Sequence, residues 1–574
     1  MCGIAGFNFR VNKENILKKL HHRGPDEDGV FEDKNFSFFH TRLSIQDIQS
    51  GHQPFFYKNY MIIFNGEIYN HIELRKNLDV NFTTSSDTET LLHLYLKYRE
   101  NMFEMIDGMF AFCIYDGERL FFARDRAGKK PLYIYQKGDK FGFSSEINAL
   151  KFLDLSIDED DIKLFLDTGF CESGYKEISE FPAGHYGYFK KELKTYKYFD
   201  ILDFYNQPKI LNPYEEVEKV LEISIKNRLV SSDVEVGAFL SGGIDSSLIV
   251  AKASEFQKLK TFTVRFDGQF DESSLALLVA KRYNTEHHII DVNIDFNEIE
   301  KIILNYGKPF FDSSAIPSYF VSKEASKHLK VVLNGDGADE IFGGYRRYVP
   351  FIKGWDKIAK KFAFILPLLS PTSRGKLMFV YRLIRASNKE GIEWYNTLLN
   401  DVFVDIYSFD SKKISKIDKF IKEIKLDSFE KLSYVDFELN LKGLVMKMDI
   451  ATMANSLEAR SPFLSKYMLE LAPRIDKNDK LLKKILRELS NKYLPHELIN
   501  APKRGFEIPL TNWVNNEMNE IIMSYLDKGF YKHFVDEKVI KNIIERKINI
   551  PEDKRAKILY LLFTLELWYE NRFS

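Results

Sequence analysis

Residues 234–252, VEVGAFLSGGIDSSLIVAK, decide the fold of the larger part of this chain. The apolar run 234–240 predicts a short strand, Ser241-Gly242-Gly243 interrupts it, and a helix follows through Lys252. Glycines let a backbone approach a ligand closely, and serine hydroxyls at a helix N-terminus favour an anion. Taken alone, the loop could instead be a simple helix-capping turn. Neither a Walker loop nor a dinucleotide site is indicated, because Gly-Lys-Ser/Thr and Gly-x-Gly-x-x-Gly are both missing.

Predicted strands and helices continue to alternate after this loop. Strands are expected at 261–266, 288–292 and 331–333, and a helix at 272–283. This alternation predicts a parallel, doubly wound sheet, which binds ligands at the carboxyl ends of its strands. From about Arg346 onward, we expect a mainly helical region.

The first 200 residues have a different pattern and are predicted to be mostly β, with one amphipathic helix. Ile201–Pro213 holds two prolines and little periodicity, so it is interpreted as a linker. We therefore expect two domains, residues 1–205 and 206–574. The predicted strands of the first domain are 35–40, 60–64, 109–115 and 120–123, and its helix is 88–99.

The composition excludes several classes of protein. The chain has 574 residues with 45% hydrophobic and 29% charged content, which are globular values. Its net charge of −1 provides no global field for nucleic acid. Cys2, Cys113 and Cys171 form no CxxC pair, which favours a reducing compartment, and we expect a cytoplasmic location.

No stretch approaches the roughly 20 apolar residues that a membrane span requires, and the N-terminus lacks the features of an export signal. The best apolar candidate is Phe362–Leu369, which is short and contains Pro367. We expect it to be a buried helix start or a loop, with docking on a membrane as the alternative.

Cys2 directly follows the initiator methionine. Its small side chain favours removal of Met1, which would place a cysteine at the N-terminus. Such a residue carries a nucleophile and a base together, because its α-amine titrates at roughly 7.7–8.0 and can accept the thiol proton. A merely structural terminal cysteine is the alternative on this residue alone.

Eight short motifs follow Cys2 along the first 150 residues. They are His22-Arg23-Gly24-Pro25-Asp26, His40-Thr41-Arg42-Leu43-Ser44-Ile45, Gly51-His52-Gln53-Pro54, Phe64-Asn65-Gly66-Glu67-Ile68-Tyr69-Asn70, Ser86-Asp87-Thr88-Glu89, Gly108-Met109-Phe110-Ala111-Phe112, 123–133 (ARDRAGKKPLY) and Phe143-Ser144-Ser145-Glu146. In this order and spacing they resemble the glutaminase domain of the N-terminal-nucleophile amidotransferases, and most closely the glutamine-hydrolysing asparagine synthetase family. The fold that this resemblance implies is an αββα sandwich.

The resemblance implies roles for this first site. Cys2 would attack the side-chain amide of glutamine, and Asn65 with Gly66 would form the oxyanion hole. Arg42 would hold the α-carboxylate of glutamine and Asp87 its α-ammonium, with Glu67 beside them. Ordinary surface charge is the alternative for Arg42 and Asp87 taken singly.

The second half resembles the family's ATP-pyrophosphatase domain, which adenylates a carboxylate and releases pyrophosphate. Asp336 would lie near the adenylation centre, and Lys503 would stabilise charge on the phosphorus or the tetrahedral intermediate. Asp245 and Asp339 would carry Mg²⁺. The residues implied to bind ATP are Leu240, Ser241, Gly242, Gly243, Asp245, Ser246, Ser247, Val264, Asn334 and Gly335.

The chain departs from the family pattern on the acceptor side. Family members commonly have Leu-Pro-Asp-Asp-Leu-Leu before Lys-Val-Asp, whereas this chain has NLKGLVMKMD at 440–449. Asn334 replaces the usual serine, and Ser465 replaces an aspartate. The lost acidic pair is either a detail of a helix start or a mark of a different acceptor.

We therefore expect a glutamine-dependent amide-forming ligase whose cofactors are ATP and Mg²⁺. Aspartate is the default acceptor, giving asparagine, and ammonia would pass inside the protein between the two sites. Another carboxylate, such as a sugar acid in surface-polysaccharide synthesis, is the second hypothesis. A non-catalytic binding homologue is the third. The partners expected are small-molecule substrates and, from the family, a homodimer, with no nucleic acid and no membrane span.

Overall fold

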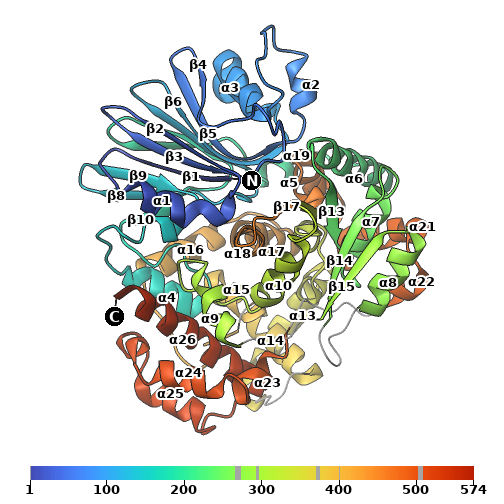
Figure 1. Cartoon of the computed structure of the whole chain (residues 1–574). Helices are drawn as coiled ribbons and strands as arrows, with labels where there is room; N and C mark the ends of the chain where they lie inside the picture. The colour runs from blue at the N-terminus through green and yellow to red at the C-terminus, as the bar shows by residue number, and fades with distance from the viewer. Residues whose placement is uncertain are drawn as a thin grey trace.

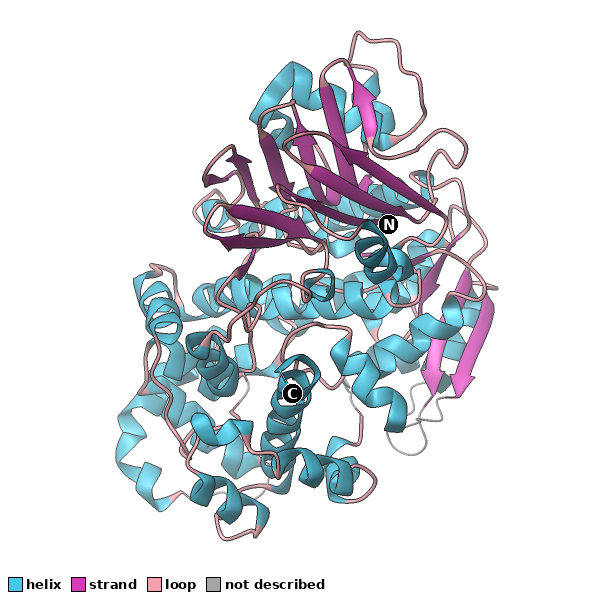
Figure 2. Ribbon diagram, turned by 60° about the vertical axis from the view of Figure 1, so that its left-hand side comes forward, coloured by secondary structure: helices cyan, strands magenta, loops and turns pink. Residues whose placement is uncertain are grey.

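The computed structural model describes residues 2–265, 273–291, 296–369, 375–399, 401–501 and 508–573. Figure 1 shows an N-terminal β-rich part above a larger part that holds a second sheet and many helices. Figure 2 shows the same division from the side, with strands concentrated in the upper part. The two-part α+β and α/β architecture expected from the sequence is therefore confirmed.

The N-terminal part is an αββα sandwich. Among the described residues up to 200, two antiparallel six-stranded sheets occur, in the orders β10-β8-β9-β1-β3-β2 and β12-β11-β7-β6-β5-β4. The strands are β1 Cys2–Phe7, β2 Glu27–Glu32, β3 Ser37–Arg42, β4 Phe55–Tyr57, β5 Tyr60–Ile68, β6 Gly108–Tyr115, β7 Leu120–Arg124, β8 Tyr133–Lys137, β9 Lys140–Ser144, β10 Ile178–Glu180, β11 His185–Phe189 and β12 Leu193–Lys197.

Alternation along β5 explains how this sandwich packs. Successive side chains of a strand point to opposite faces. Met61 and Ile63 pack with Phe38 of the other sheet, whereas Ile62 and Phe64 pack against a helix on the outer face. Other helices cover the opposite sheet, which completes the four layers. The helices of this part are α1 Lys13–Leu20, α2 His71–Arg75, α3 Asp87–Tyr98, α4 Glu159–Thr168 and α5 Leu202–Tyr205.

The second part contains a parallel sheet in the order β15-β14-β13-β16-β17, counted over the described residues. The strand order reverses beside β13, since β14 and β15 lie on one side of it and β16 and β17 on the other. Ligands of open α/β sheets bind at such a switch point, beyond the carboxyl ends of the strands. The strands are β13 Val236–Phe239, β14 Lys260–Arg265, β15 Glu286–Asp291, β16 Val331–Leu333 and β17 Glu458–Arg460.

Helices cover both faces of this sheet, as a doubly wound fold requires. Val331 and Leu333 pack into one hydrophobic cluster, and Val332 between them packs into the other. The helices around the sheet are α6 Pro213–Val230, α7 Ile244–Ala253, α8 Ser273–Arg282, α9 Phe296–Leu304, α10 Ala315–Ala325 and α11 Ala338–Ile341.

The remainder is helical, as expected. The long helix α26 packs Trp568 against Tyr175 of the N-terminal part, with ring centroids 5.3 Å apart. No helix among the described residues is long and apolar enough to cross a membrane. These helices are α12 Val349–Ile352, α13 Trp355–Ala359, α14 Lys376–Ser387, α15 Gly391–Leu398, α16 Lys412–Glu423, α17 Ser428–Val435, α18 Leu441–Met453, α19 Lys466–Leu471, α20 Lys477–Lys480, α21 Lys484–Tyr493, α22 His496–Asn500, α23 Leu510–Asn515, α24 Asn519–Leu526, α25 Glu537–Ile544 and α26 Glu552–Phe573.

Two sequence expectations need correction. Ile201–Pro213 is not entirely linker, because it contains α5 and its last residue begins α6, where a proline fits the first turn. Phe362–Leu369 is not buried. It belongs largely to a 3₁₀ segment, Lys360–Leu368, that has no buried residue, and Leu368 is 81% exposed.

The two parts meet through a buried network of charges. The carboxylate of Asp449 in α18 accepts from Arg23 Nη2 at 2.8 Å and from Lys130 Nζ at 2.9 Å. Arg23 also donates to Glu146 at 2.9 Å. All four side chains are at most 3% exposed. The cations depress the Asp449 pKa against the effect of burial, so this carboxylate stays ionised between the two parts.

Replacing Asp449 by asparagine should destabilise the fold by about 3–5 kcal/mol, because two buried cations lose their shared anion. Calorimetry should show a fall of several degrees in the melting temperature. Asp154→Asn is the matched control, since Asp154 is 87% exposed and pairs with Lys137 at the surface. Equal melting temperatures for both variants would contradict the importance of the network.

Candidate active sites

The first site lies where β1, β3 and β5 come together. Cys2 begins β1 and pairs with Arg42 at the end of β3. The backbone N–H of Cys2 donates to Asn65 Oδ1 of β5 at 3.2 Å. Cys2 is 6% exposed. Burial raises the pKa of the Cys2 thiol, and although the charge of Arg42 lowers it, the thiol needs a base to ionise at neutral pH.

Asn65 offers a donor that the protein itself does not use. Its side chain is fully buried, and Asn65 Nδ2 has no hydrogen-bond partner within the part of the chain that the structure describes. A buried amide without a partner is costly, so such groups often await a ligand. The neighbouring Gly66 lies so close to β6 that an added Cβ would stand 2.1 Å from the Met109 carbonyl oxygen. Only glycine therefore fits at this position.

The guanidinium of Arg42 makes several hydrogen bonds within the protein that the sequence did not predict. Its guanidinium donates to Glu27 Oε2 at 3.1 Å and to the carbonyls of Gln46 and Asp47 at 3.1 and 2.6 Å. These bonds fix the loop after β3. Arg42 is 4% exposed, beside the thiol, and its charge acts on the Cys2 pKa.

Two buried carboxylates complete the cluster. Asp87 is the first residue of α3, and its Oδ2 accepts from the Ile68 N–H at the end of β5 at 2.8 Å. Burial raises the pKa of Asp87 to about 6. Burial and the charge of Asp87 also raise the pKa of Glu67, whose Oε1 lies 3.6 Å from Arg460 Nη2 of β17. Arg460 thus extends from the second part of the chain to the first site.

The second site lies at the switch point of the parallel sheet. Ser241 N–H donates to Ser246 Oγ at 3.1 Å, which closes the Ser-Gly-Gly turn before α7. An added Cβ on Gly335 would stand 3.1 Å from Asp245 Cβ, so the loops after β13 and β16 are in contact. Ser247 is fully buried below the turn. Leu240, Val264 and Asn334 are buried around the same strand ends.

The carboxylates of Asp245 and Asp339 both contact the ammonium group of Lys483. Lys483 Nζ lies 2.6 Å from Asp245 Oδ2 and 2.9 Å from Asp339 Oδ1. Two carboxylates suit Mg²⁺, which is often held by one or two acidic residues together with substrate phosphates. Among the described residues, no group of three or more His, Cys, Asp or Glu could hold a metal by itself. The residues present therefore fit Mg²⁺ only together with nucleotide phosphates.

Asp336 receives a directed chain of hydrogen bonds from the N-terminal part. Lys129 Nζ donates to Ser461 Oγ at 2.5 Å, and Ser461 Oγ donates to Asn334 Oδ1 at 2.5 Å. Asn334 Nδ2 then donates to Asp336 Oδ2 at 2.7 Å. Burial raises the pKa of Asp336, while the charges of Lys129 and Lys447 lower it.

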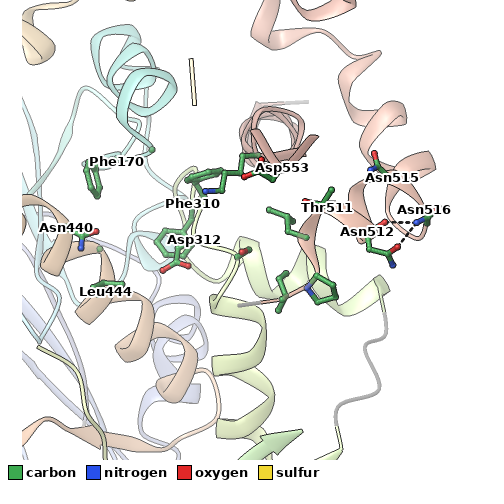
Figure 3. Close-up of a pocket in the computed structure, with 18 residues that line it drawn as sticks. Phe170, Phe310, Asp312, Asn440, Leu444, Thr511, Asn512, Asn515, Asn516 and Asp553 are labelled. Carbon is green, nitrogen blue, oxygen red and sulfur yellow. Dashed lines mark hydrogen bonds between the residues drawn. The ribbon is translucent and has the colours of Figure 1, made fainter. Parts of the chain in front are cut away.

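A cavity of about 750 Å³ lies in the second part, between residues 310–313, α18 and α23. Figure 3 shows Asp312 with Phe310 on one wall, Asn440 and Leu444 of the α18 region on another, and Asn512 on the C-terminal side. Lys447 Nζ donates to Ser314 Oγ at 2.8 Å and lies 3.5 Å from Asp312 Oδ2. Lys447 thus lies beside Asp312, which lines the cavity, and its charge also acts on Asp336.

The structure assembles both predicted groups of residues, with one exception: Lys503 lies outside the described residues. Sequence reasoning missed Lys129, Lys447, Arg460, Ser461 and Lys483. Lys129 stands inside the motif 123–133, but nothing in the spacing of Lys129 or Arg460 indicated that their side chains cross between the two parts. Lys483 carries no sequence signal beyond a lysine-rich stretch.

Comparison with known proteins agrees with this arrangement. The family described as asparagine synthase matches residues 216–570, and the glutamine amidotransferase domain matches residues 1–199. The chain is similar to asparagine synthetase [glutamine-hydrolyzing] 1 of Bacillus subtilis (strain 168), with 33% identity over 99% of this chain and 96% of the relative. Asparagine synthetase B of Escherichia coli (strain K12) is 32% identical over 60% of this chain and 65% of the relative.

Among solved structures, glutamine phosphoribosylpyrophosphate amidotransferase from B. subtilis aligns with 16% identity and a TM-score of 0.28, covering 58% of this chain and 75% of that one. The family matches and the near full-length relative are decisive. The chain belongs to the asparagine synthase family of carbon–nitrogen ligases, with a glutamine amidotransferase domain preceding the synthase domain.

Proposed function

We propose that this chain hydrolyses glutamine at Cys2 and uses the ammonia to amidate aspartate, which ATP activates as an acyl-adenylate. The observation that carries this proposal is the contact between two sites of different chemistry on one chain, with Arg460 and Lys129 crossing between them. The relatives named as asparagine synthetases support aspartate as the acceptor. The products would be asparagine, glutamate, AMP and pyrophosphate.

In the first half-reaction, the Cys2 sulfur attacks the amide carbon of glutamine, the C–N bond breaks, and a thioester forms while ammonia leaves. The α-amine exposed by removal of Met1 would take the thiol proton. Asn65 Nδ2 and the Gly66 N–H would stabilise the oxyanion, and one such donor is worth about 3–4 kcal/mol in the transition state. Arg42, Glu67 and Asp87 would hold the charged ends of glutamine.

In the second half-reaction, the acceptor carboxylate attacks the α-phosphorus of ATP, and the bond to pyrophosphate breaks. Ammonia then attacks the carbonyl carbon of the acyl-adenylate, and AMP leaves as the amide forms. The Ser241–Gly243 turn and the start of α7 would hold the pyrophosphate. Asp245 and Asp339 would hold Mg²⁺, which supplies neutralising charge to the phosphates when bound. Lys483, which pairs with both carboxylates, would add positive charge beside the bound phosphates. Lys503 would stabilise charge on the phosphorus or on the tetrahedral intermediate.

We propose as a second candidate a larger carboxylate, such as a sugar acid, bound in the cavity that Asp312 and Asn440 line. The cavity of about 750 Å³ is much larger than aspartate needs. Asn440, Gly443 and Leu444, which line it, belong to the stretch that departs from the family pattern.

We also propose domain limits of 1–205 and 206–574, transfer of ammonia inside the protein, and a homodimer as in the family expectation.

The deciding experiment supplies purified protein with ATP, Mg²⁺, amide-¹⁵N glutamine and aspartate, and follows the products by mass spectrometry. We expect ¹⁵N-asparagine, AMP and pyrophosphate in equal amounts. Cys2→Ala should abolish the use of glutamine and retain synthesis from free ammonia. Cys113→Ala is the matched control. If glutamine is hydrolysed without formation of asparagine, aspartate is the wrong acceptor, and a panel of uronic acids becomes the next test.

The glutaminase should lose efficiency below pH 6. Because the pKa of Asp87 is about 6, the carboxylate that holds the glutamine ammonium becomes protonated as the pH falls through that value. We expect kcat/KM to fall about tenfold per pH unit below it. The Asp87→Asn variant should have a low kcat/KM at every pH and should not show this fall below pH 6. The Asp79→Asn variant, changed at an exposed residue, should behave as wild type. If the fall persists in Asp87→Asn, it belongs to Glu67.

Lys129→Met should lower ammonia-dependent synthesis about tenfold or more and leave glutamine hydrolysis unchanged. Without the ammonium group of Lys129, the pKa of Asp336 rises. As the pH is lowered, the variant should therefore lose activity at a higher pH than wild type does. The ratio of variant to wild-type rate cancels the titration of ammonia itself. Lys129→Arg retains the charge and should restore the profile, whereas an unshifted profile in Lys129→Met would contradict a role through Asp336.

A further inference from the structure

Exposed hydrophobic side chains concentrate in one short stretch of the synthase domain. Of eighteen large hydrophobic residues that are exposed among the described residues, eight lie between positions 355 and 380. Scattered exposed apolar residues are ordinary, whereas a concentration marks an interaction site. The most exposed members are Trp355 (44%), Ile358 (59%), Phe364 (72%), Leu368 (81%) and Leu377 (66%).

These residues form one protruding unit, which we call the apolar cap: α13, the 3₁₀ segment Lys360–Leu368, and α14. The three segments pack on one another. The 3₁₀ segment has no buried residue, so it presents its side chains outward. Figure 1 places α14 far from the N-terminal sheets. None of the described residues assigned above to either site lies in α13, the 3₁₀ segment or α14.

The cap is also strongly basic in an otherwise neutral chain. Lys353, Lys357, Lys360, Lys361 and Lys376 are all exposed around the apolar side chains. Asp356 is the one acidic residue from 353 to 385, and its Oδ2 accepts from Ser428 Oγ at 3.2 Å. The chain as a whole has a net charge of −1. A positive apolar surface thus stands on a nearly neutral protein.

The positive charge of the cap favours an anionic membrane over a second copy of the chain as its partner. A second copy of the chain bound through the same surface would oppose the same lysines across a two-fold axis, and like charges facing each other are unfavourable. A surface that combines tryptophan, phenylalanine and leucine with lysine is typical of a segment that lies in the interface of an anionic bilayer. There the apolar side chains enter the acyl boundary while the lysine ammonium groups stay at the headgroups.

We propose that the apolar cap docks this enzyme on the surface of an anionic membrane. The docking is peripheral, since no described helix could span the bilayer. The inference does not depend on the identity of the acceptor, because binding to lipid is measured without any substrate.

The test is co-sedimentation of the full chain with vesicles of phosphatidylcholine alone or with about one-third phosphatidylglycerol, at low and high salt. We expect binding to the anionic vesicles, weakened by salt and at least tenfold weaker on phosphatidylcholine. The double variants Phe364→Ser/Leu368→Ser and Lys360→Gln/Lys361→Gln should each lose binding at least tenfold. Amidation activity in vesicle-free solution should be unchanged in both.

Matched controls come from exposed residues elsewhere. Leu211→Ser removes a side chain that is 96% exposed, and Lys191→Gln/Lys194→Gln removes two exposed charges. Both should bind vesicles as wild type does. Equal binding to both vesicle types, or full binding by the cap variants, would overturn the proposal. So would a wild-type dimer in light scattering that becomes a monomer in Phe364→Ser/Leu368→Ser, because the cap would then be a subunit interface.

Discussion

The carboxylate of Asp449, held between Arg23 and Lys130, is the contact on which the arrangement of the two domains depends. Both cations come from the amidotransferase domain, and the anion comes from a helix of the synthase domain. Burying any one of these charges alone would cost free energy, whereas opposite charges that are buried together attract one another strongly. The network therefore favours one relative position of the domains, and with it the contacts that connect the two active sites.

Two further contacts depend on that position. Arg460 of β17 brings its guanidinium near Glu67 in the glutamine site, while its carbonyl accepts from the Asn334 N–H at 2.9 Å. Lys129 acts in the opposite direction, from the amidotransferase domain toward Asp336. The edge strand β17 is thus the element through which each site contacts the other domain. This gives a physical reason for the two chemistries to occur on one chain.

Much of the fold was predictable, because local patterns carry it. The alternation in 60–64 and 109–115 indicated strands, which β5 and β6 confirm, and the strand–glycine–helix pattern at 234–252 indicated the parallel sheet. The strand β17 was missed because its sequence, Glu458-Ala459-Arg460, has two charged residues and no apolar run like that of β16. Phe362–Leu369 was interpreted as buried because composition reports hydrophobicity but not which side of a segment is covered.

The sequence by itself determined the family to which the motifs belong and the Ser-Gly-Gly turn before a helix, and it predicted a nucleophile at Cys2. These features are local, so neighbouring residues suffice to specify them. Only the tertiary structure decided that Lys483 lies between Asp245 and Asp339 and that Lys129 acts on Asp336 through two other side chains. Such contacts join residues hundreds of positions apart, and packing of the two domains, not spacing along the chain, brings them together.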